Sequence, residues 1–314
     1  MNENKRYITH EQVRSNFFKS GLLIVLLIAI IILLSLAIGY LYDEIAYGFL
    51  IGLGITIIVV PVQLVTSKLS IVMMTKGKKV EPDQQEYHQL VSSVEGMSIS
   101  AGLKKAPDIY VIPSNVPNAF ASGITEKSAF IGVTQGLLDT LDKQELEGVI
   151  AHEISHIVHK DVMLTTIAVS LVSIIMMLSF ILSRMAFFGG GKSSRKNNNS
   201  KGNAGAVILI ITLVAILLRP IASIITNLIQ MAISRKREYA ADAYAVRLCG
   251  FSQGLSNALK KIGGKKAYTS EEKQSLGGTN MKCMYISFPS SNISNLFSTH
   301  PPIAKRIEIL ENMY

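Results

Sequence analysis

The chain has 314 residues, of which 49% are hydrophobic, and it carries a formal net charge of +9. Its mean hydropathy of +0.35 is too high for an ordinary soluble domain, and the excess is concentrated in long uncharged runs. The charge does not indicate nucleic-acid binding, because many basic residues flank these runs and the chain has no Trp for a base-stacking platform. Attraction to anionic lipid explains the same charges better, so we expect a lipid bilayer and no nucleic acid among the partners.

Two uncharged runs near the N-terminus, Gly21–Tyr40 and Ala46–Val65, are each long enough to cross a membrane as a helix. Basic residues precede the first run, as in a signal peptide. However, the run is too long for one, and no small-residue cleavage site precedes the acidic turn at Asp43–Glu44. We interpret residues 1–79 as a retained membrane anchor with two spans.

The charges around these spans predict their orientation. Basic residues precede the first span and follow the second, whereas the turn between them is acidic. These basic residues are Lys5, Arg6, Arg14 and Lys19 before the first span, and Lys68, Lys76, Lys78 and Lys79 after the second. The positive-inside rule then predicts that the N-terminus and the segment after Lys68 face the cytoplasm.

The first water-facing segment, residues 80–160, is predicted to begin with a helix and two strands. Apolar residues at helical spacing predict a helix within Glu81–Leu103. Ile109–Ile112 and Ala129–Val133 have the composition of short strands, and turn residues separate them.

A second helix of this segment is predicted to begin at a capping box. Asp142 is followed three residues later by Glu145, which is the typical spacing. We expect this helix to run to about Lys160. Because its first half is charged, it is expected to begin outside the membrane.

The sequence HEISH lies on this predicted helix and is typical of a hydrolytic zinc centre. Residues four apart share one helix face, so His152 and His156 can bind one metal ion. Glu153 lies beside the metal, where a base is needed to take a proton from water. Two histidines packed on a helix face are the alternative. His159 and Val162 stand where a metzincin has glycine and histidine, so we expect His159 to face solvent instead.

The third uncharged run, Val162–Leu182, is long enough for a further span, whereas the fourth, within 206–233, is interrupted by Arg219–Pro220. Arg219 either faces the interior of a helix bundle or the segment lies partly in the membrane interface. The loop Gly189–Gly205 is basic, although it would lie outside if both runs cross. Either the positive-inside rule fails for this loop, or the two runs do not both span the membrane.

A further polar helix is predicted from Ser234, in the sequence SRKREYAAD, with Glu238 and Asp242 on one face. Catalytic zinc uses three protein ligands and leaves the fourth position to water. Glu238 can supply the third ligand, and Asp242 can accept a hydrogen bond from a ligand imidazole. The alternative is a surface helix in which Glu238 pairs with Arg235 or Arg237, and the HEISH motif makes it less favourable. A hairpin of the third and fourth runs would bring both motifs to one membrane face.

The C-terminal segment is predicted to end in a helix opened by Pro301–Pro302, directly after His300. The apolar residues on one face of this helix are Ile303, Ile307 and Leu310. Cys249 and Cys283 match neither a metal site nor a disulfide framework, so we expect ordinary reduced thiols.

Four motifs together resemble the HtpX-type membrane zinc metallopeptidases, which are relatives of the CAAX prenyl endopeptidases. They are HEISH with Asp161 five residues on, SRKREYAAD, PNAFASG at Pro117–Gly123 and STHPP at Ser298–Pro302. The resemblance covers most of the chain in the family's order. It implies His152, His156 and Glu238 as zinc ligands and Glu153 as the general base.

The same resemblance implies that Asn118–Ala121 lies on an edge strand that pairs with an extended substrate backbone. It implies protein quality control, in which misfolded or damaged proteins are cleaved at the cytoplasmic face. It leaves His300 and Arg306 as candidate transition-state stabilisers, although we favour a structural role in a cap and a core-docking helix.

We therefore predict a mainly α integral membrane protein with a small β-sheet. A zincin-like metalloprotease domain is built from two segments, 80–160 with HExxH and 234–314 with the third zinc ligand, and a hydrophobic hairpin at 161–233 separates them. The predicted function is a zinc endopeptidase with one Zn²⁺ per chain, acting on protein substrates such as unfolded membrane proteins. The first alternative is a non-catalytic, zinc-stabilised membrane scaffold, although no ready fourth protein ligand is evident. The second is an intramembrane protease, which the charged start of the HEISH helix disfavours.

Overall fold

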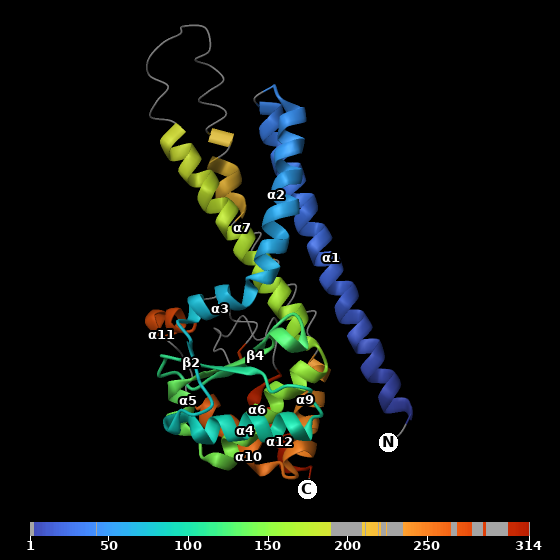
Figure 1. Ribbon diagram of the computed structural model, residues 1–314, viewed down its shortest axis with the longest axis vertical. Helices are drawn as coiled ribbons and strands as arrows, with labels where there is room; N and C mark the ends of the chain where they lie inside the picture. The colour runs from blue at the N-terminus through green and yellow to red at the C-terminus, as the bar shows by residue number, and fades with distance from the viewer. Residues whose placement is uncertain are drawn as a thin grey trace. The chain divides into compact units, whose positions relative to one another are not determined.

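The computed structural model (Figure 1) describes residues 3–41, 43–189, 209–210, 212–218, 220, 224, 235–264, 269–277, 285–286 and 301–313. The chain divides into two compact units. One comprises residues 1–19, 67–167 and 228–314, and the other comprises residues 20–66 and 168–227. Most of the predicted fourth run lies outside the described residues, as do the loop 190–205, Arg219, Cys283 and His300. The predictions that concern them stay predictions.

Three described helices are long and apolar enough to cross a membrane, which confirms the helices predicted at the first three uncharged runs. They are α1 (Glu3–Leu41) over Arg14–Tyr40, α2 (Ile45–Val65) over its full length, and α7 (Asp161–Gly189) over Asp161–Arg184. Where α1 meets α2, a Cβ added at Gly39 would lie 2.9 Å from the Cα atom of Gly48. Small residues at this contact let the two backbones approach closely.

The unit that contains residues 67–167 holds a sheet of four strands in the order β1-β2-β4-β3. They are β1 (Lys78–Lys79), β2 (Asp108–Ile112), β3 (Ala119–Ser122) and β4 (Phe130–Thr134). β2 and β4 pair in parallel, with Ile109 opposite Ile131, and these are the two strands predicted from composition. β3 pairs antiparallel to β4 and forms one edge of the sheet. The two-residue strand β1 was not predicted.

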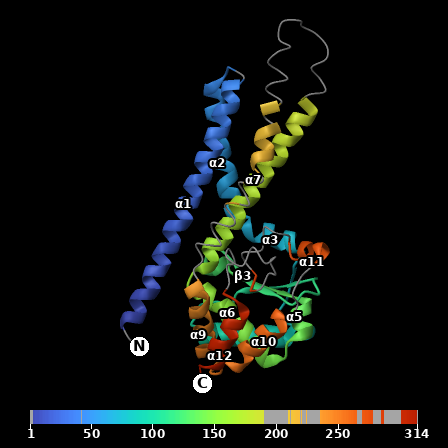
Figure 2. The same ribbon diagram turned by 180° about the vertical axis from the view of Figure 1, so that it is seen from behind.

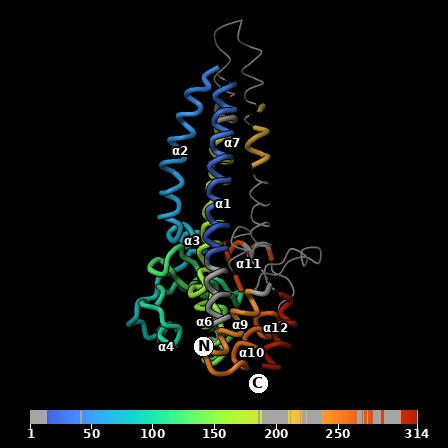
Figure 3. The backbone as a smooth tube through the Cα atoms, turned by 90° about the vertical axis from the view of Figure 1, so that its right-hand side faces the viewer, coloured from blue at the N-terminus to red at the C-terminus, as the bar shows by residue number. Residues whose placement is uncertain are grey.

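The helices of this unit surround α6 (Lys143–Val158), which packs against α4 (His88–Ser100), α9 (Arg235–Cys249), α10 (Gln253–Gly263) and β3. Figure 2 shows α9 and α12 (Ile303–Glu311) beside each other, and these two helices are also in contact. In Figure 3 the orange helices α9 and α10 lie beside α6, although α7 and the segment after it separate them along the chain. The other α-helices among the described residues of this unit are α3 (Ser67–Thr75), α5 (Gln135–Thr140) and α11 (Ser270–Ser275).

The capping box at the start of α6 is confirmed. The N–H group of Glu145 donates to Oδ1 of Asp142 at 3.0 Å, and that of Asp142 donates to Oε2 of Glu145 at 2.9 Å. The helix ends at Val158, and Lys160 adopts a left-handed φ of 56° before α7 begins. This turn separates α6, which carries HEISH, from the third candidate span.

Two other elements differ slightly from the predictions. The helix predicted within Glu81–Leu103 is the shorter α4, which a 3-10 turn at Gln85–Tyr87 precedes. The final helix begins at Ile303 as predicted, and Leu310 is fully buried while Ile303 and Ile307 pack against the same core.

Candidate metal centre

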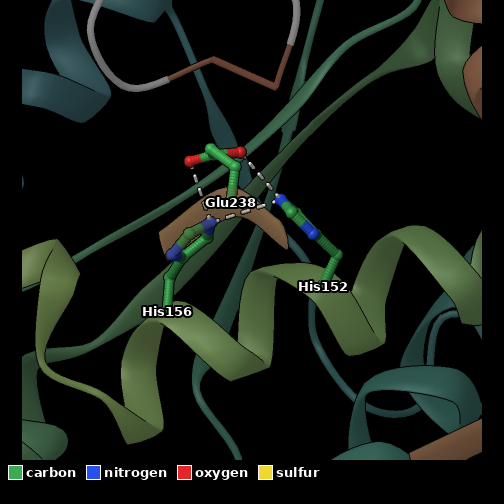
Figure 4. Close-up of side chains that lie close together, drawn as sticks. All are labelled: His152, His156 and Glu238. Atoms are coloured by element: carbon green, nitrogen blue, oxygen red, sulfur yellow. Dashed lines mark hydrogen bonds and ion pairs between the residues drawn. The ribbon is translucent and has the colours of Figure 1, made fainter. Parts of the chain in front are cut away.

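His152 and His156 lie one turn apart on α6 and point toward Glu238 of α9, as Figure 4 shows. The two Nε2 atoms are 3.2 Å apart. Oε2 of Glu238 lies 3.6 Å from Nε2 of His152, and Oε1 lies 3.7 Å from Nε2 of His156. One ligand atom from each residue therefore lies within 4.8 Å of the others. The two sequence segments thus bring these three predicted residues to one place.

This spacing fits a tetrahedral zinc ion. Bonds of about 2.0–2.1 Å to nitrogen and oxygen, at tetrahedral angles, place two ligand atoms about 3.4 Å apart. The Nε2–Nε2 separation of 3.2 Å is close to that value, and each Nε2 lies 3.6 or 3.7 Å from a different oxygen of the Glu238 carboxylate. Two imidazoles and a carboxylate also form a donor set that catalytic zinc sites use.

The outer ring nitrogen of His152 is held by Asp242, as the sequence predicts. Nδ1 of His152 lies 2.9 Å from Oδ1 of Asp242. Nε and Nη2 of Arg306 donate to the two carboxylate oxygens of Asp242 at 2.9 and 2.6 Å. This arrangement orients the imidazole so that Nε2 faces Glu238.

The outer ring nitrogen of His156 is held in the same way by Asp161. Nδ1 of His156 lies 3.1 Å from Oδ2 of Asp161. Arg237 donates from Nη2 to Oδ1 of the same carboxylate. Arg237 therefore pairs with Asp161, so the alternative in which this arginine serves as the partner of Glu238 is not adopted.

Burial sets the charge states around the site. Desolvation lowers the pKa of the fully buried His152, an effect that the positive charge of Arg306 reinforces. Burial alone would raise the pKa of Asp242, but Arg306 and His152 hold it below its usual value. A neutral imidazole and an ionised carboxylate are the forms that a metal-binding His–Asp pair needs.

Arg306 of the final helix lies within the site and donates to Asp242, which agrees with the structural role that the sequence favoured. The final helix docks on the core as predicted, and the Arg306 side chain is fully buried within the site, with Nη1 3.8 Å from Oε2 of Glu238. Burial lowers its pKa, and the carboxylates of Asp242, Glu238 and Glu153 raise it above the ordinary value. Apart from the family resemblance, nothing in the sequence around Arg306 indicated that this arginine would be buried in the site.

Glu153 follows His152 on α6 and is only 3% exposed. It lies close enough to Arg306 for its charge to act on that guanidinium. Glu153 is thus a buried carboxylate next to a candidate metal ligand in the sequence.

The prediction that His159 faces solvent is wrong. Its side chain is half-buried, with Nδ1 2.7 Å from the carbonyl oxygen of Ser155 and the ring 5.1 Å from that of Tyr244 in an edge-to-face contact. The reason is that α9 packs over the last turn of α6. Burial lowers the pKa of His159.

Strand β3, which carries most of the predicted substrate-binding segment, is an edge strand and is completely buried. The carbonyl oxygen of Ala119 accepts a hydrogen bond from the N–H group of Ile286 at 3.1 Å. The ring of Phe120 packs edge-to-face on Tyr285 at 5.0 Å. Residues 285–286 therefore contact this edge near the start of β3.

A comparison with protein-family models matches residues 84–314 to peptidase family M48. This match covers both segments that supply the side chains of the site. Together with the apolar helices, the fold and the site define a membrane metalloprotease.

Curated relatives extend the match to nearly the whole chain. The protease HtpX homolog of Listeria monocytogenes serovar 1/2a is 40% identical over 308 residues, which cover 96% of this chain and 99% of the relative. That of Lactobacillus acidophilus is 35% identical and covers 97% of this chain and 99% of the relative. A crystal structure of S. mikatae Ste24p aligns with a TM-score of 0.48 and 23% identity, covering 96% of this chain and 67% of that one. The chain belongs to peptidase family M48, as an HtpX-type protease.

Proposed function

We propose that the chain is a zinc endopeptidase in which His152, His156 and Glu238 bind the ion and Glu153 is the general base. The observation that carries this proposal is the convergence of two Nε2 atoms, 3.2 Å apart, on the Glu238 carboxylate. The carboxylates of Asp242 and Asp161, at 2.9 and 3.1 Å from the outer nitrogens, support it.

The proposed mechanism assigns one task to each side chain. When bound, zinc supplies a Lewis acid that lowers the pKa of water and polarises the scissile carbonyl. Glu153 accepts the proton of the attacking water and later delivers it to the leaving amine. Asp242 and Asp161 keep the ligand imidazoles in the tautomer whose Nε2 is free to bind.

The proposed substrates are misfolded or damaged proteins, including unfolded membrane proteins, cleaved at the cytoplasmic face. An extended substrate that adds to the edge of the sheet at β3 would have to pair beyond Ala119, whose carbonyl oxygen already accepts a hydrogen bond from Ile286. Backbone hydrogen bonds rather than side-chain pockets would provide much of its binding. Such binding is tolerant of sequence, which suits a protease that selects unfolded chains.

We expect Glu153→Gln to retain zinc and to lose proteolysis, because the amide cannot accept the water proton. Removal of a general base typically reduces the rate by about 10²–10⁴-fold. Digestion of unfolded casein by the purified full-length protein, together with metal analysis of the same sample, measures both quantities. Glu147→Gln, on the same helix but half-buried and beside Lys143, is the matched control and should change neither.

In the same assay Glu238→Ala should reduce the zinc content. Full zinc occupancy in this variant would remove Glu238 from the ligand set, and undiminished cleavage by Glu153→Gln would refute the base assignment. A wild-type protein that holds zinc but cleaves no protein would favour the zinc-stabilised scaffold.

The proposed cytoplasmic orientation predicts where a reporter enzyme will be active. A reporter that works only in the cytoplasm should be inactive when fused after Asp43, between α1 and α2, and active when fused after Gly102. The reverse pattern would place the catalytic segment on the other side of the membrane.

A further inference from the structure

Asn16 of α1 contacts the residues that support the candidate metal centre, although 140 residues separate it from His156 along the chain. Its Nδ2 donates to Oδ1 of Asp161 at 3.1 Å, and its Oδ1 accepts from Nη1 of Arg237 at 2.9 Å. All four residues belong to the same compact unit. The carboxamide therefore uses both of its ends within one small network.

The network leads directly to one proposed zinc ligand. Oδ1 of Asp161 receives Asn16 and Arg237, whereas Oδ2 lies 3.1 Å from Nδ1 of His156. With Oδ1 held from two directions, the plane of the carboxylate is fixed, and so is the direction in which Oδ2 meets the imidazole. Without Asn16, Oδ1 of Asp161 would keep Arg237 as its donor, and the carboxylate plane would be fixed less firmly.

The burial of Asn16 indicates that these contacts matter energetically. Asn16 is 1% exposed, whereas the neighbouring Phe17 and Phe18 are 53% and 74% exposed. It lies two residues inside the first candidate span, where a buried amide is costly unless both of its polar groups are hydrogen-bonded. Of these three consecutive side chains, the helix thus turns its one polar residue inward, to Asp161 and Arg237.

We infer that Asn16 is a positioning residue for the metal centre: through Asp161 it orients His156, so that the N-terminal membrane helix sets the affinity for zinc. This inference rests on the proposed function. Its consequence is that the metal centre is fully assembled only while Asn16 of α1 is hydrogen-bonded to Asp161 and Arg237. Displacement of the anchor helix would then lower metal affinity without any change at the ligands themselves.

The test is the zinc dissociation constant of full-length Asn16→Leu in detergent, measured by competition with a chelating dye. Leucine keeps the branched shape and removes both hydrogen bonds. Losing a direct partner of a ligand usually lowers affinity about 10- to 100-fold, and because Asn16 acts through Asp161 we expect a loss of about 10-fold. Ser20→Ala is the matched control. Ser20 lies one turn further along α1, is 3% exposed, and its hydroxyl has no hydrogen-bond partner among the described residues. The zinc affinity of the Ser20→Ala variant should equal that of the wild type.

A double-mutant cycle separates positioning from a general loss of stability. In an Asp161→Ala background, Asn16→Leu should cause no further loss of zinc affinity, because its path to His156 is already interrupted. The visible spectrum of the cobalt-substituted Asn16→Leu protein at saturating metal should also shift, whereas that of Ser20→Ala should not. If Asn16→Leu does not accumulate, Asn16→Ser replaces it, since a hydroxyl is too short to reach both partners.

Two results would overturn the inference: wild-type zinc affinity in both Asn16 variants, or an undiminished effect of Asn16→Leu in the Asp161→Ala background. Either result leaves the proposed function intact as long as zinc binding still depends on His152, His156 and Glu238. Failure of the wild-type protein to bind zinc at these residues would instead remove the proposed function itself.

Discussion

Each histidine of the centre is supported by its own carboxylate and arginine. His152 is followed outward by Asp242 and Arg306, and His156 by Asp161 and Arg237. An ionised carboxylate beside each imidazole fixes the tautomer, and the arginine offsets the charge that burial would otherwise make costly. The two arginines are not equivalent. Carboxylates raise the pKa of Arg306, whereas burial lowers that of Arg237 to about 10.

At the same scale, the half-buried Cys249 is predicted to be an unreactive thiol. Burial raises its pKa to about 11 from an ordinary value of 9.0. Because the thiolate is the reactive form, alkylation at pH 8 should be about 100-fold slower than for an exposed cysteine. Mass spectrometry of the peptide that contains Cys249, after a timed exposure to iodoacetamide, measures this rate. The same protein in denaturant serves as the reference, and equal rates in the two states would contradict the prediction.

At the scale of elements, the position of the HEISH helix depends on a close approach to α10. A Cβ added at Gly148 of α6 would lie 2.6 Å from the backbone nitrogen of Leu255 and 2.9 Å from its Cα atom. Because these are backbone atoms, no side-chain rotation can relieve the contact. Gly148 thus sets the distance between α6, which carries HEISH, and α10.

Gly148→Ala is therefore expected to destabilise the protein by about 1–3 kcal/mol, the usual cost of overpacking. Gly96→Ala is the matched control, since Gly96 lies inside α4 and a Cβ there would meet nothing within 4 Å. That change should be neutral or should stabilise by up to about 1 kcal/mol, because alanine is the better helix former. Thermal unfolding of both variants in the same detergent compares them. Equal midpoints would mean that α6 and α10 can separate freely.

At the scale of the whole molecule, the candidate metal centre joins two segments that are remote in sequence. Two of its proposed ligands come from residues 80–160 and one from residues 234–314, and α6 packs against α9. A metal ion that binds the folded state alone would stabilise the contact between these segments.

Removal of zinc by a chelator should therefore abolish proteolysis and also lower the midpoint of thermal unfolding. With free zinc at about a thousand times its dissociation constant, the expected stabilisation is about 4 kcal/mol. Scanning calorimetry or a dye-based melt with chelator, and again after zinc is restored, measures it. Glu238→Ala should show no zinc-dependent shift. A wild-type midpoint that does not respond to zinc would argue against coupling between the centre and the fold.

Local patterns were sufficient for those elements whose signal is contained in neighbouring residues. The uncharged runs of α1, α2 and α7, the capping box at Asp142 and the two parallel strands all follow from periodicity, length or spacing, because these features determine the local backbone. The His152–Asp242 contact was also predictable once two motifs were assumed to share one metal.

Tertiary packing alone decided the rest. The burial of His159 against Tyr244, the insertion of Arg306 beside His152 and the link from Asn16 to Asp161 each join residues from different elements. No local pattern encodes such contacts, because they depend on which helix faces meet after the chain has folded. The sequence by itself determined the apolar helices and the chemical groups of the centre. The partners that hold those groups in place were determined by the packing of α9 on α6, by the insertion of Arg306 from α12 and by the contact of Asn16 with Asp161.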